Sequence, residues 1–539
     1  MSDDTGRMIT FGHIYRTDAP VEEFGRKASN LAEMASLGIP VPPGFVLNIS
    51  ICVDYFRNSR EMPPYVPDLL KNGISFLEKA TGNIFGNERK PLLVSVRSGS
   101  AISMPGAMET VLNVGLNQDT LKGLIFQTGN PRFAWDCYRR LFESFAKTVF
   151  SHNIDDYFSF LEDIKLKEGI FEESELDSFS IKELIRNYED LFLDISGKRF
   201  PDNVYEQLEL AVIGVLDSWM SPKAQEFRRM EFHEKARGTA VTIQTMVFGN
   251  SDMNSGSGIL FTRNPWSGEN SCVIDFKFCV QGEDLVSGYR AGTKRMNLIE
   301  VLPDIHKDLV YLSKLLETHY RDMQDIEFTV QQGKIYILQS RDGKRAPFAA
   351  LRIASDMFDE GIIDSETALE RLKTIDLNNI VTQEIVSNNN IIGRGDSASS
   401  GITCGRIALS NAKAELFSKD GHVILIRNSP SSEDIKGIRA SVGYLTAKGA
   451  RTAHAAVVAR QMGKVCIVNC TDINIDIDAG KCIIDNQQLF EGDTISIDGN
   501  TGYIYEGKVK IKIERPTELL SRIKEWETLP SKKNKDGKS

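Results

Sequence analysis

The sequence predicts a multidomain protein of the α/β and α+β classes. Its 539 residues exceed the roughly 250–300 residues at which a single core stops growing, so we expect several compact domains. Stretches with apolar residues every three or four positions, which indicate helices, occur among short apolar segments bounded by turn residues, which indicate strands. The composition, 41% hydrophobic and 26% charged, is typical of a globular protein.

Composition also excludes several classes of function. No apolar run approaches the roughly 20 residues that cross a bilayer, and the start MSDDTGRMITFGH lacks the regions of a signal peptide, so we expect a cytoplasmic protein without a membrane partner. A formal net charge of -10, without concentrated Lys and Arg, argues against a nucleic-acid partner. The eight cysteines lack the spacing of a zinc site and are expected to be reduced thiols.

The first predicted domain covers residues 1–342. Up to about residue 130, helix and strand patterns mix, as in LAEMASLG, a helix ended by Gly38, and the strand in KPLLVSVRSGS. From about 130 to 235 the period is helical, which predicts a helical subdomain. Strands then return in TAVTIQTMVFG, GSGILFTRNP, SCVIDFKFCV and a hairpin that ends the domain.

Residues 343–395 are predicted to be a helical connector and hinge. RAPFAALRIASDMFDEG and DSETALERL read as helices, and SNNNIIGRGDSASSG, rich in Asn, Ser and Gly, reads as the hinge. A second domain follows over 396–513, with short β segments around one clear helix, AAVVARQMG. Residues 514–539 are predicted to be a tail whose tip, SKKNKDGKS, is disordered.

The hairpin DIEFTVQQGKIYILQSR concentrates charged side chains on one face. A three-residue loop, Gln331-Gln332-Gly333, would pair Val330 with Lys334 and place Arg341 opposite Met323. That register aligns Asp325, Glu327, Gln339 and Arg341 on one face. The opposite face, which can be buried, carries the apolar side chains of Ile326, Phe328, Val330, Tyr336 and Leu338. Two carboxylates so spaced can coordinate Mg²⁺, and an arginine and an amide can hold phosphate oxygens. The alternative is an exposed amphipathic hairpin with solvated charges.

Two basic residues near the N-terminus lie where anions bind. Lys27 is expected just before a helix, and Arg97 at the end of a strand followed by a loop with Gly99 and Gly106. Glycines allow backbone amides to approach phosphate oxygens, and fixed positive charges neutralise a polyphosphate. Taken singly, each of these residues is more simply a solvated side chain.

Several segments, in the same order, resemble the ATP-grasp domain of the pyruvate phosphate dikinase family: GRKASNLAEMASLGIPVPPGF, PLLVSVRSGSAISMPGAMETVLNVGLN, GTAVTIQTMVFGN, GILFTRNPWSGEN, QGEDLVSGYR and MQDIEFTVQQGKIYILQSRDGKR. The resemblance implies an ATP-grasp domain with a helical insertion. It also implies ATP and Mg²⁺ as cofactors, with Asp325 and Glu327 as metal ligands. The residues implied to bind nucleotide are Lys27, Arg97, Thr239, Gln244, Met246, Val247, Glu283, Gln339 and Arg341. GRKAS departs from the GGKGA usual in the family but keeps the lysine.

One histidine stands before a helix of small residues. In TAKGARTAHAAVVARQMGK, His454 directly precedes that helix, which Gly463 can end. A helix N-terminus favours a neutral, nucleophilic imidazole and then stabilises a phosphoryl anion on it. A lone histidine there is usually a cap or a surface residue. The surrounding T-x-H-A-A-V-V-A-R, however, resembles the phosphohistidine motif of the family's swivelling β/β/α domain, although Lys448 and Ala453 depart from it.

The resemblance implies a phosphotransferase of the dikinase type. ATP would phosphorylate His454 with release of AMP, with orthophosphate or water as co-substrate, and the phosphoryl group would pass to an acceptor. A pyruvate- or phosphoenolpyruvate-binding barrel needs roughly 250 residues, and similarity ends near residue 513, so we expect that barrel to be missing. The acceptor is then a small molecule or a partner subunit. The alternatives are a non-catalytic regulatory or binding module, or a truncated pyruvate phosphate dikinase.

Overall fold

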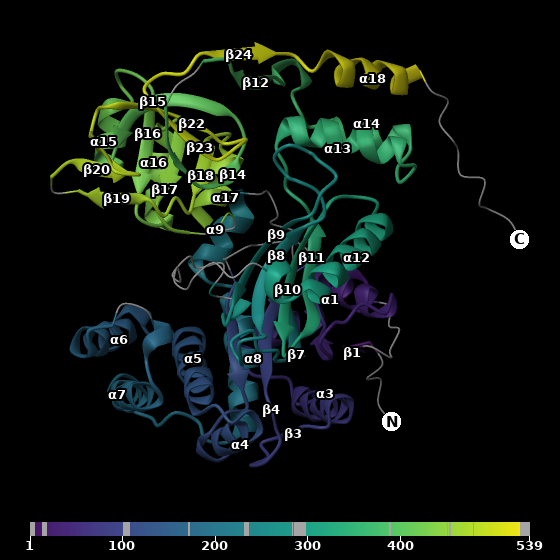
Figure 1. Cartoon of the computed structure of the whole chain (residues 1–539). Helices are drawn as coiled ribbons and strands as arrows, with labels where there is room; N and C mark the ends of the chain where they lie inside the picture. The colour runs from purple at the N-terminus through teal and green to yellow at the C-terminus, as the bar shows by residue number, and fades with distance from the viewer. Residues whose placement is uncertain are drawn as a thin grey trace, which may run out of the picture. The chain divides into compact units, whose positions relative to one another are not determined.

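The computed structural model describes residues 6–12, 19–100, 108–170, 173–230, 237–282, 284, 298–387, 390–449, 451, 454–477 and 479–528. By internal contacts the chain divides into two compact units (Figure 1). Unit 1 comprises Met1–Ser255 with Thr329–Ser340, and unit 2 comprises Gly256–Phe328 with Arg341–Ser539. This division falls elsewhere than the predicted boundaries near residues 342 and 396, which stay a prediction.

A five-stranded sheet forms the centre of unit 1. Its strands, in spatial order, are β1 (Met8–Phe11), β2 (Gly44–Leu47), β7 (Ala240–Thr245), β5 (Val94–Gly99) and β6 (Thr110–Val114). All six residues of β7 are buried because the strand pairs antiparallel with both β2 and β5. A separate ribbon pairs β3 (Ile84–Phe85) with β4 (Pro91–Leu92).

Helices in unit 1 follow the predicted pattern. Near the sheet lie α1 (Val21–Ser36), α2 (Ile49–Arg57), α3 (Val66–Thr81) and α4 (Gln118–Thr128). The helices predicted between about 130 and 235 are confirmed as α5 (Pro131–Phe150), α6 (Ile154–Glu168), α7 (Ser178–Ser196), α8 (Val204–Ser218) and α9 (Pro222–Met230). Side chains of Asn130, Asn153, Asp177 and Asn203 cap the first four of these helices, which explains where they begin.

The predicted hairpin is present, but its loop is shorter than expected. In the four-stranded sheet the order is β11 (Lys334–Asp342), β10 (Gln324–Gln331), β8 (Gly256–Phe261) and β9 (Val273–Phe278). Only Gln332 and Gly333 connect β10 to β11, and both have positive φ (51° and 72°). That geometry is a two-residue hairpin turn, whose twist matches that of the strands. The predicted three-residue loop was therefore wrong.

The shorter loop changes which side chains of β11 are buried. Ile335 and Ile337 are buried, whereas Tyr336 and Leu338, expected in the core, are only half-buried. On β10, burial of Ile326, Phe328 and Val330 is confirmed. Next to the turn, a one-residue change in the loop moves the side chains of β11 to the other face, which accounts for the error.

The register also differs at the far end of the hairpin. The N–H of Gly343 donates to the Met323 carbonyl over 2.8 Å, so Met323 lies opposite Gly343 and not opposite Arg341 as predicted. The observed partner of Met323 is two residues further along the chain than the predicted one. Because side chains alternate with a period of two, the side chains at this end of β11 point to the predicted faces.

Helices of unit 2 lie within and after the strands of this sheet. Between β9 and β10 are α11 (Leu298–Val301) and α12 (Pro303–Tyr320), and after β11 come α13 (Pro347–Asp359), α14 (Ser365–Leu372) and the short 3-10 turn η2 (Leu377–Asn379). The two helices predicted for the connector are thus confirmed as α13 and α14.

An eight-stranded sheet forms most of the C-terminal part of unit 2. The order is β13 (Ile391–Arg394), β23 (Tyr503–Glu506), β22 (Thr494–Asp498), β15 (Ile402–Ala408), β16 (Val423–Arg427), β17 (Gly443–Thr446), β18 (Val465–Val468) and β14 (Asp396–Ser399). Strands β15 to β18 are mutually parallel. Their crossovers carry α15 (Asn411–Phe417), the 3-10 turn η3 (Ser432–Asp434) with α16 (Ile435–Ala440), and α17 (His454–Gln461). The prediction of one helix there was wrong, because α15 and α16 are too short to show a clear period.

A small three-stranded sheet joins this part of unit 2. It consists of β19 (Ile473–Asp476), β20 (Lys481–Ile484) and β21 (Gln487–Phe490), three strands that are not among the predicted ones.

Residues predicted as a hinge instead contribute strands to that sheet. Within 387–401, β13 pairs with β23 and β14 pairs with β18. The glycines that suggested a flexible loop are needed for close packing, since a Cβ on Gly395 would lie 2.6 Å from Ile467 Cγ2. Strand pairing and packing outweigh the local composition in this segment.

The predicted C-terminal tail is partly a packed helix. Antiparallel strands β12 (Thr382–Ile385) and β24 (Ile511–Glu514) form a ribbon, after which α18 (Thr517–Thr528) packs against α13 and α14 (Figure 1). Ile523 and Trp526 are 7% and 2% exposed in the core they share. The basic tip, residues 531–539, lies outside the described residues. In the described part of the chain, no helix has both the length and the apolar character to span a membrane.

Candidate functional site

Lys27 lies just after a kink in α1. Gly25 interrupts the helix with φ 79°, and the Arg26 N–H donates to the Ser100 carbonyl over 3.1 Å. A Cβ on Gly25 would lie 2.3 Å from the Gly99 carbonyl oxygen, so only glycine allows this approach. The prediction that Lys27 precedes the helix was wrong, because α1 begins earlier, at Val21. The kink nevertheless places Lys27 in the first turn of a new helical segment, beside the end of β5.

Arg97 and Thr239 lie at the same end of β5. Arg97 is opposite Thr242 of β7 and Thr110 of β6. The Thr239 side chain is fully buried; its Oγ1 accepts a hydrogen bond from the Gly99 N–H (3.1 Å) and donates to the Ala240 carbonyl (2.9 Å). Thr239 therefore holds the end of β5, two residues after Arg97.

Three of the residues implied to bind nucleotide, Gln244, Met246 and Val247, lie at the other end of β7. Gln244 is 2% exposed and its Nε2 donates to the Pro42 carbonyl over 3.0 Å. Met246 follows the strand, and its N–H donates to the Leu93 carbonyl over 2.9 Å. Met246 and Val247 are half-buried, so their side chains offer some apolar surface.

On the hairpin, the structure brings together Asp325, Glu327 and Arg341. Arg341 Nε donates to Asp325 Oδ2 over 2.9 Å, and Arg341 Nη2 lies 4.0 Å from Glu327 Oε1. Burial raises the pKa of Asp325, an effect that the neighbouring Arg341 charge opposes. We refer to these three residues as the acidic hairpin cluster.

The other two predicted residues of this region are Gln339 and Glu283. Gln339 is half-buried in β11, two residues before Arg341. Glu283 lies outside the described residues.

Donor atoms in the acidic hairpin cluster fit a divalent cation. Asp325 Oδ1 is buried and has no hydrogen-bond partner within the described residues, which leaves one carboxylate oxygen unsatisfied. Across the same described ranges, no group of three or more His, Cys, Asp and Glu side chains is arranged to hold a metal. Mg²⁺ commonly uses only one or two carboxylates and takes its other ligands from water and substrate phosphates. Asp325 and Glu327 therefore fit Mg²⁺ bound together with a polyphosphate.

His454 is the first residue of α17. The helix follows β17, so its N-terminus lies at the carboxyl edge of the parallel strands β15 to β18, where open α/β sheets bind ligands. Gly463, with φ 66°, ends the segment as predicted.

Two charged residues near His454 were missed by the sequence analysis. Asp275 of β9 accepts a hydrogen bond from the backbone N–H of Arg451, three residues before His454, and burial raises the pKa of Asp275. Arg460 of α17 acts on the Asp325 carboxylate electrostatically. A carboxylate inside the otherwise apolar strand pattern V-I-D-F was the available signal for Asp275.

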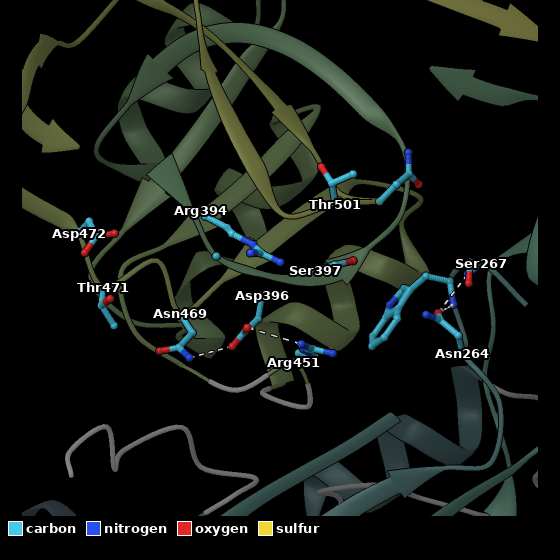
Figure 2. Close-up of a pocket in the computed structure, with 13 residues that line it drawn as sticks. Asn264, Ser267, Arg394, Asp396, Ser397, Arg451, Asn469, Thr471, Asp472 and Thr501 are labelled. Atoms are coloured by element: carbon cyan, nitrogen blue, oxygen red, sulfur yellow. Dashed lines mark hydrogen bonds and ion pairs between the residues drawn. The ribbon is translucent and has the colours of Figure 1, made fainter. Parts of the chain in front are cut away.

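A polar cavity of about 580 Å³ lies in unit 2 near the start of α17 (Figure 2). Asp396 on its wall accepts a hydrogen bond from Asn469 Nδ2 (2.8 Å) and forms an ion pair with Arg451 (3.5 Å). Asn264, Trp266 and Ser267 of the β8–β9 connection also line it.

Two families of known proteins match the sequence. Two ranges, residues 61–300 and 291–361, match "Pyruvate phosphate dikinase, AMP/ATP-binding domain". Together these ranges cover more than half of the chain. Residues 419–502 match "PEP-utilising enzyme, mobile domain".

Individual relatives resemble the chain over most of its length. It is 41% identical over 509 residues to the chloroplastic pyruvate, phosphate dikinase of Flaveria pringlei, covering 93% of this chain and 53% of the relative. It is 38% identical over 508 residues to the pyruvate, phosphate dikinase of Clostridium symbiosum, covering 93% and 58%. It is also 38% identical to the pyruvate, phosphate dikinase of Rhizobium meliloti (strain 1021), and the match covers 94% of this chain and 58% of the relative. The chain thus spans about half the length of the curated relatives it matches.

Proposed function

The chain belongs to the pyruvate phosphate dikinase family, and on that premise we propose that it is an ATP-dependent phosphotransferase that carries a phosphoryl group on His454. The observation that supports this most is that the AMP/ATP-binding match and the mobile-domain match occur together in one chain. His454, in the second match, stands at a helix N-terminus suited to holding a phosphoryl anion.

We propose that the nucleotide-binding part has the ATP-grasp fold, with α5 to α9 as its helical insertion. The β13–β23 part would be the swivelling β/β/α domain. The proposed boundaries are 1–342, 343–395 and 396–513, with a C-terminal segment over 514–539. The β12–β24 ribbon, where the chain enters and leaves the third region, supports a pivot there.

In this proposal the polyphosphate of ATP is bound by positive charge and by a metal ion. Lys27, Arg97 and Arg341 neutralise phosphate oxygens, and Gln339 donates a hydrogen bond. Mg²⁺, held by Asp325 and Glu327, would supply charge neutralisation of the phosphates. The remaining residues would contact the nucleoside or support that contact: Thr239, Gln244, Met246, Val247 and Glu283.

His454 would act as the nucleophile. A neutral imidazole nitrogen attacks the β-phosphorus of ATP, the bond to the oxygen bridging to the α-phosphorus breaks, and AMP leaves. The terminal phosphoryl group of the resulting pyrophosphoryl-histidine then passes to orthophosphate, giving pyrophosphate, or to water, giving orthophosphate. The remaining phosphohistidine donates to an acceptor, a small molecule or a partner subunit. We favour orthophosphate as co-substrate because the motifs resemble the phosphate-using enzymes of the family more closely.

The test is labelling with ATP that carries ³²P in the β-position, in the presence of Mg²⁺ and with or without orthophosphate. We expect acid-labile label on the wild-type protein and AMP in matching amount. His454→Ala should take up no label. A matched control is His422→Ala, which removes an exposed histidine of the same region and should label like wild type. Absence of label from every protein would overturn the proposal.

A further inference from the structure

The β8–β9 connection forms a rigid turn that carries Trp266. Asn264 Oδ1 accepts hydrogen bonds from the backbone N–H groups of Trp266 (2.9 Å) and Ser267 (3.0 Å). Gly268, with φ 76°, packs so closely on α13 that a Cβ there would lie 2.8 Å from Arg352 Cβ. The turn is thereby fixed on the helical connector, and the direction of the indole is set.

Trp266 contacts a strand more than a hundred residues away in sequence. The indole is 4% exposed, and its Nε1–H donates to the Ala398 carbonyl of β14 over 2.7 Å. Arg460 Nε donates to the same carbonyl over 3.1 Å. One carbonyl oxygen therefore joins the turn, β14 and α17.

Two guanidinium groups also lie near the indole ring. Those of Arg451 and Arg460 are each 5.6 Å from the ring centroid, within the range of a cation–π interaction. Burial lowers the pKa of Arg460, so this charge benefits from a polarisable ring and a carbonyl in place of water. An indole that served only as apolar filling would need neither the hydrogen bond nor the two cations.

These contacts hold the chain on both sides of His454. Arg451, three residues before it, donates its backbone N–H to Asp275 and pairs its side chain with Asp396. Arg460, six residues after it, donates from Nη2 to the Arg451 carbonyl over 3.1 Å. Arg451 and Arg460 are thus joined to each other, and the indole of Trp266 lies beside the guanidinium groups of both.

We propose that Trp266 is a positioning residue for phosphoryl transfer: it fixes the start of α17, and with it His454, against the β8–β9 sheet. This inference rests on the proposed function. The contacts of the indole with the Ala398 carbonyl and with both guanidinium groups support it.

Single-turnover labelling by ATP with ³²P in the β-position tests the inference on the full chain. Trp266→Ala should slow labelling of His454 by roughly 10- to 100-fold, as expected when a reacting group loses its fixed orientation. ATP affinity should change less than about twofold, so that the effect falls on kcat and not on KM. Trp266→Phe, which keeps a ring but loses the N–H donor, should recover part of the rate. Trp135→Phe, in α5, is the matched control and should label at the wild-type rate.

Labelling of Trp266→Ala at the wild-type rate would overturn the inference while leaving the proposed function intact. So would a loss of rate that only mirrors a loss of ATP binding. If the wild-type protein takes up no label, the proposed function fails and the contact itself is tested separately. The fluorescence of Trp266 is the difference between the emission of a protein with Trp266 and that of its Trp266→Phe variant. Arg460→Ala should make this Trp266 fluorescence more easily quenched by acrylamide. Unchanged quenching would contradict the inference in that case.

Discussion

Arg341 is the one hydrogen-bond donor seen on the buried Asp325 carboxylate within the described residues. Its guanidinium satisfies one oxygen of the buried Asp325 carboxylate, while the other oxygen has no hydrogen-bond partner among the described residues. An unsatisfied buried carboxylate costs stability, and such costs are typical of sites prepared for a ligand. The unsatisfied Asp325 oxygen is the feature of the acidic hairpin cluster that fits the proposed cation site.

Removal of Arg341 should expose that cost. We expect Arg341→Ala to lower the free energy of unfolding by about 1–3 kcal/mol, because it leaves a buried acceptor without its donor. Chemical denaturation without metal or nucleotide measures the change. Asp325→Asn in the Arg341→Ala background should restore most of the loss.

Arg522→Ala serves as the control for the Arg341 experiment. It breaks an ion pair with the exposed Asp359, which should cost no more than about 1 kcal/mol. Equal losses for the two variants would contradict the role assigned to Arg341.

Cysteine reactivity provides a second test at single residues. All eight cysteines are free, and burial raises the pKa of Cys466 to about 12 and that of Cys52, Cys470 and Cys482 to about 11. Because only the thiolate reacts, these four should resist a thiol reagent at pH 8 in the native protein and react once it is unfolded. Peptide mapping identifies the modified thiols. Rapid native modification of Cys466 would contradict the fold around β18.

At the scale of elements, the kink in α1 determines where Lys27 lies. Gly25 combines a positive φ with a very close approach to Gly99, so the kink joins α1 to the end of β5 that carries Arg97. The sequence pattern showed a helix ending at Gly38 but could not show that the helix begins at Val21 and bends at Gly25. That bend depends on a contact with a residue more than seventy positions away.

Gly25→Ala should therefore destabilise the protein more than a glycine substitution elsewhere. We expect a loss of about 2–4 kcal/mol, because left-handed strain adds to a backbone clash. Gly38→Ala is a matched control, since Gly38 has a similar φ (78°) and nothing within 4 Å of an added Cβ; it should lose only about 1 kcal/mol. Thermal unfolding compares the two, and equal losses would show that the clash is absent.

The helix α18 gives a further prediction for an element. Trp526 is 2% exposed in the core shared with α13 and α14. Replacing Trp526 by alanine should lower the free energy of unfolding of the part that contains this core by about 3–5 kcal/mol. Calorimetry should show one unfolding transition moved to lower temperature. An unchanged profile would mean that α18 does not pack there.

For the whole molecule, the sequence predicted the elements that local patterns determine. The helices α5 to α9, the buried strands β7 and β16, and the placement of His454 at a helix start all follow from periodicity and capping residues. The contacts of Trp266 and Asp275 could not be predicted, because they join segments far apart in sequence. The composition of the stretch 387–401 predicts a loop, whereas its strands pair with β18 and β23, which lie far away in sequence.

The proposed function of the chain depends on one chemical event, transfer of phosphorus from ATP to the imidazole at the start of α17. The most direct measurement is mass spectrometry of the wild-type chain after incubation with ATP and Mg²⁺ under conditions that preserve phosphoramidates. We predict one added phosphoryl or pyrophosphoryl group on the peptide that contains His454, lost on treatment with acid. An unmodified His454 peptide in the presence of ATP, Mg²⁺ and orthophosphate would contradict the account.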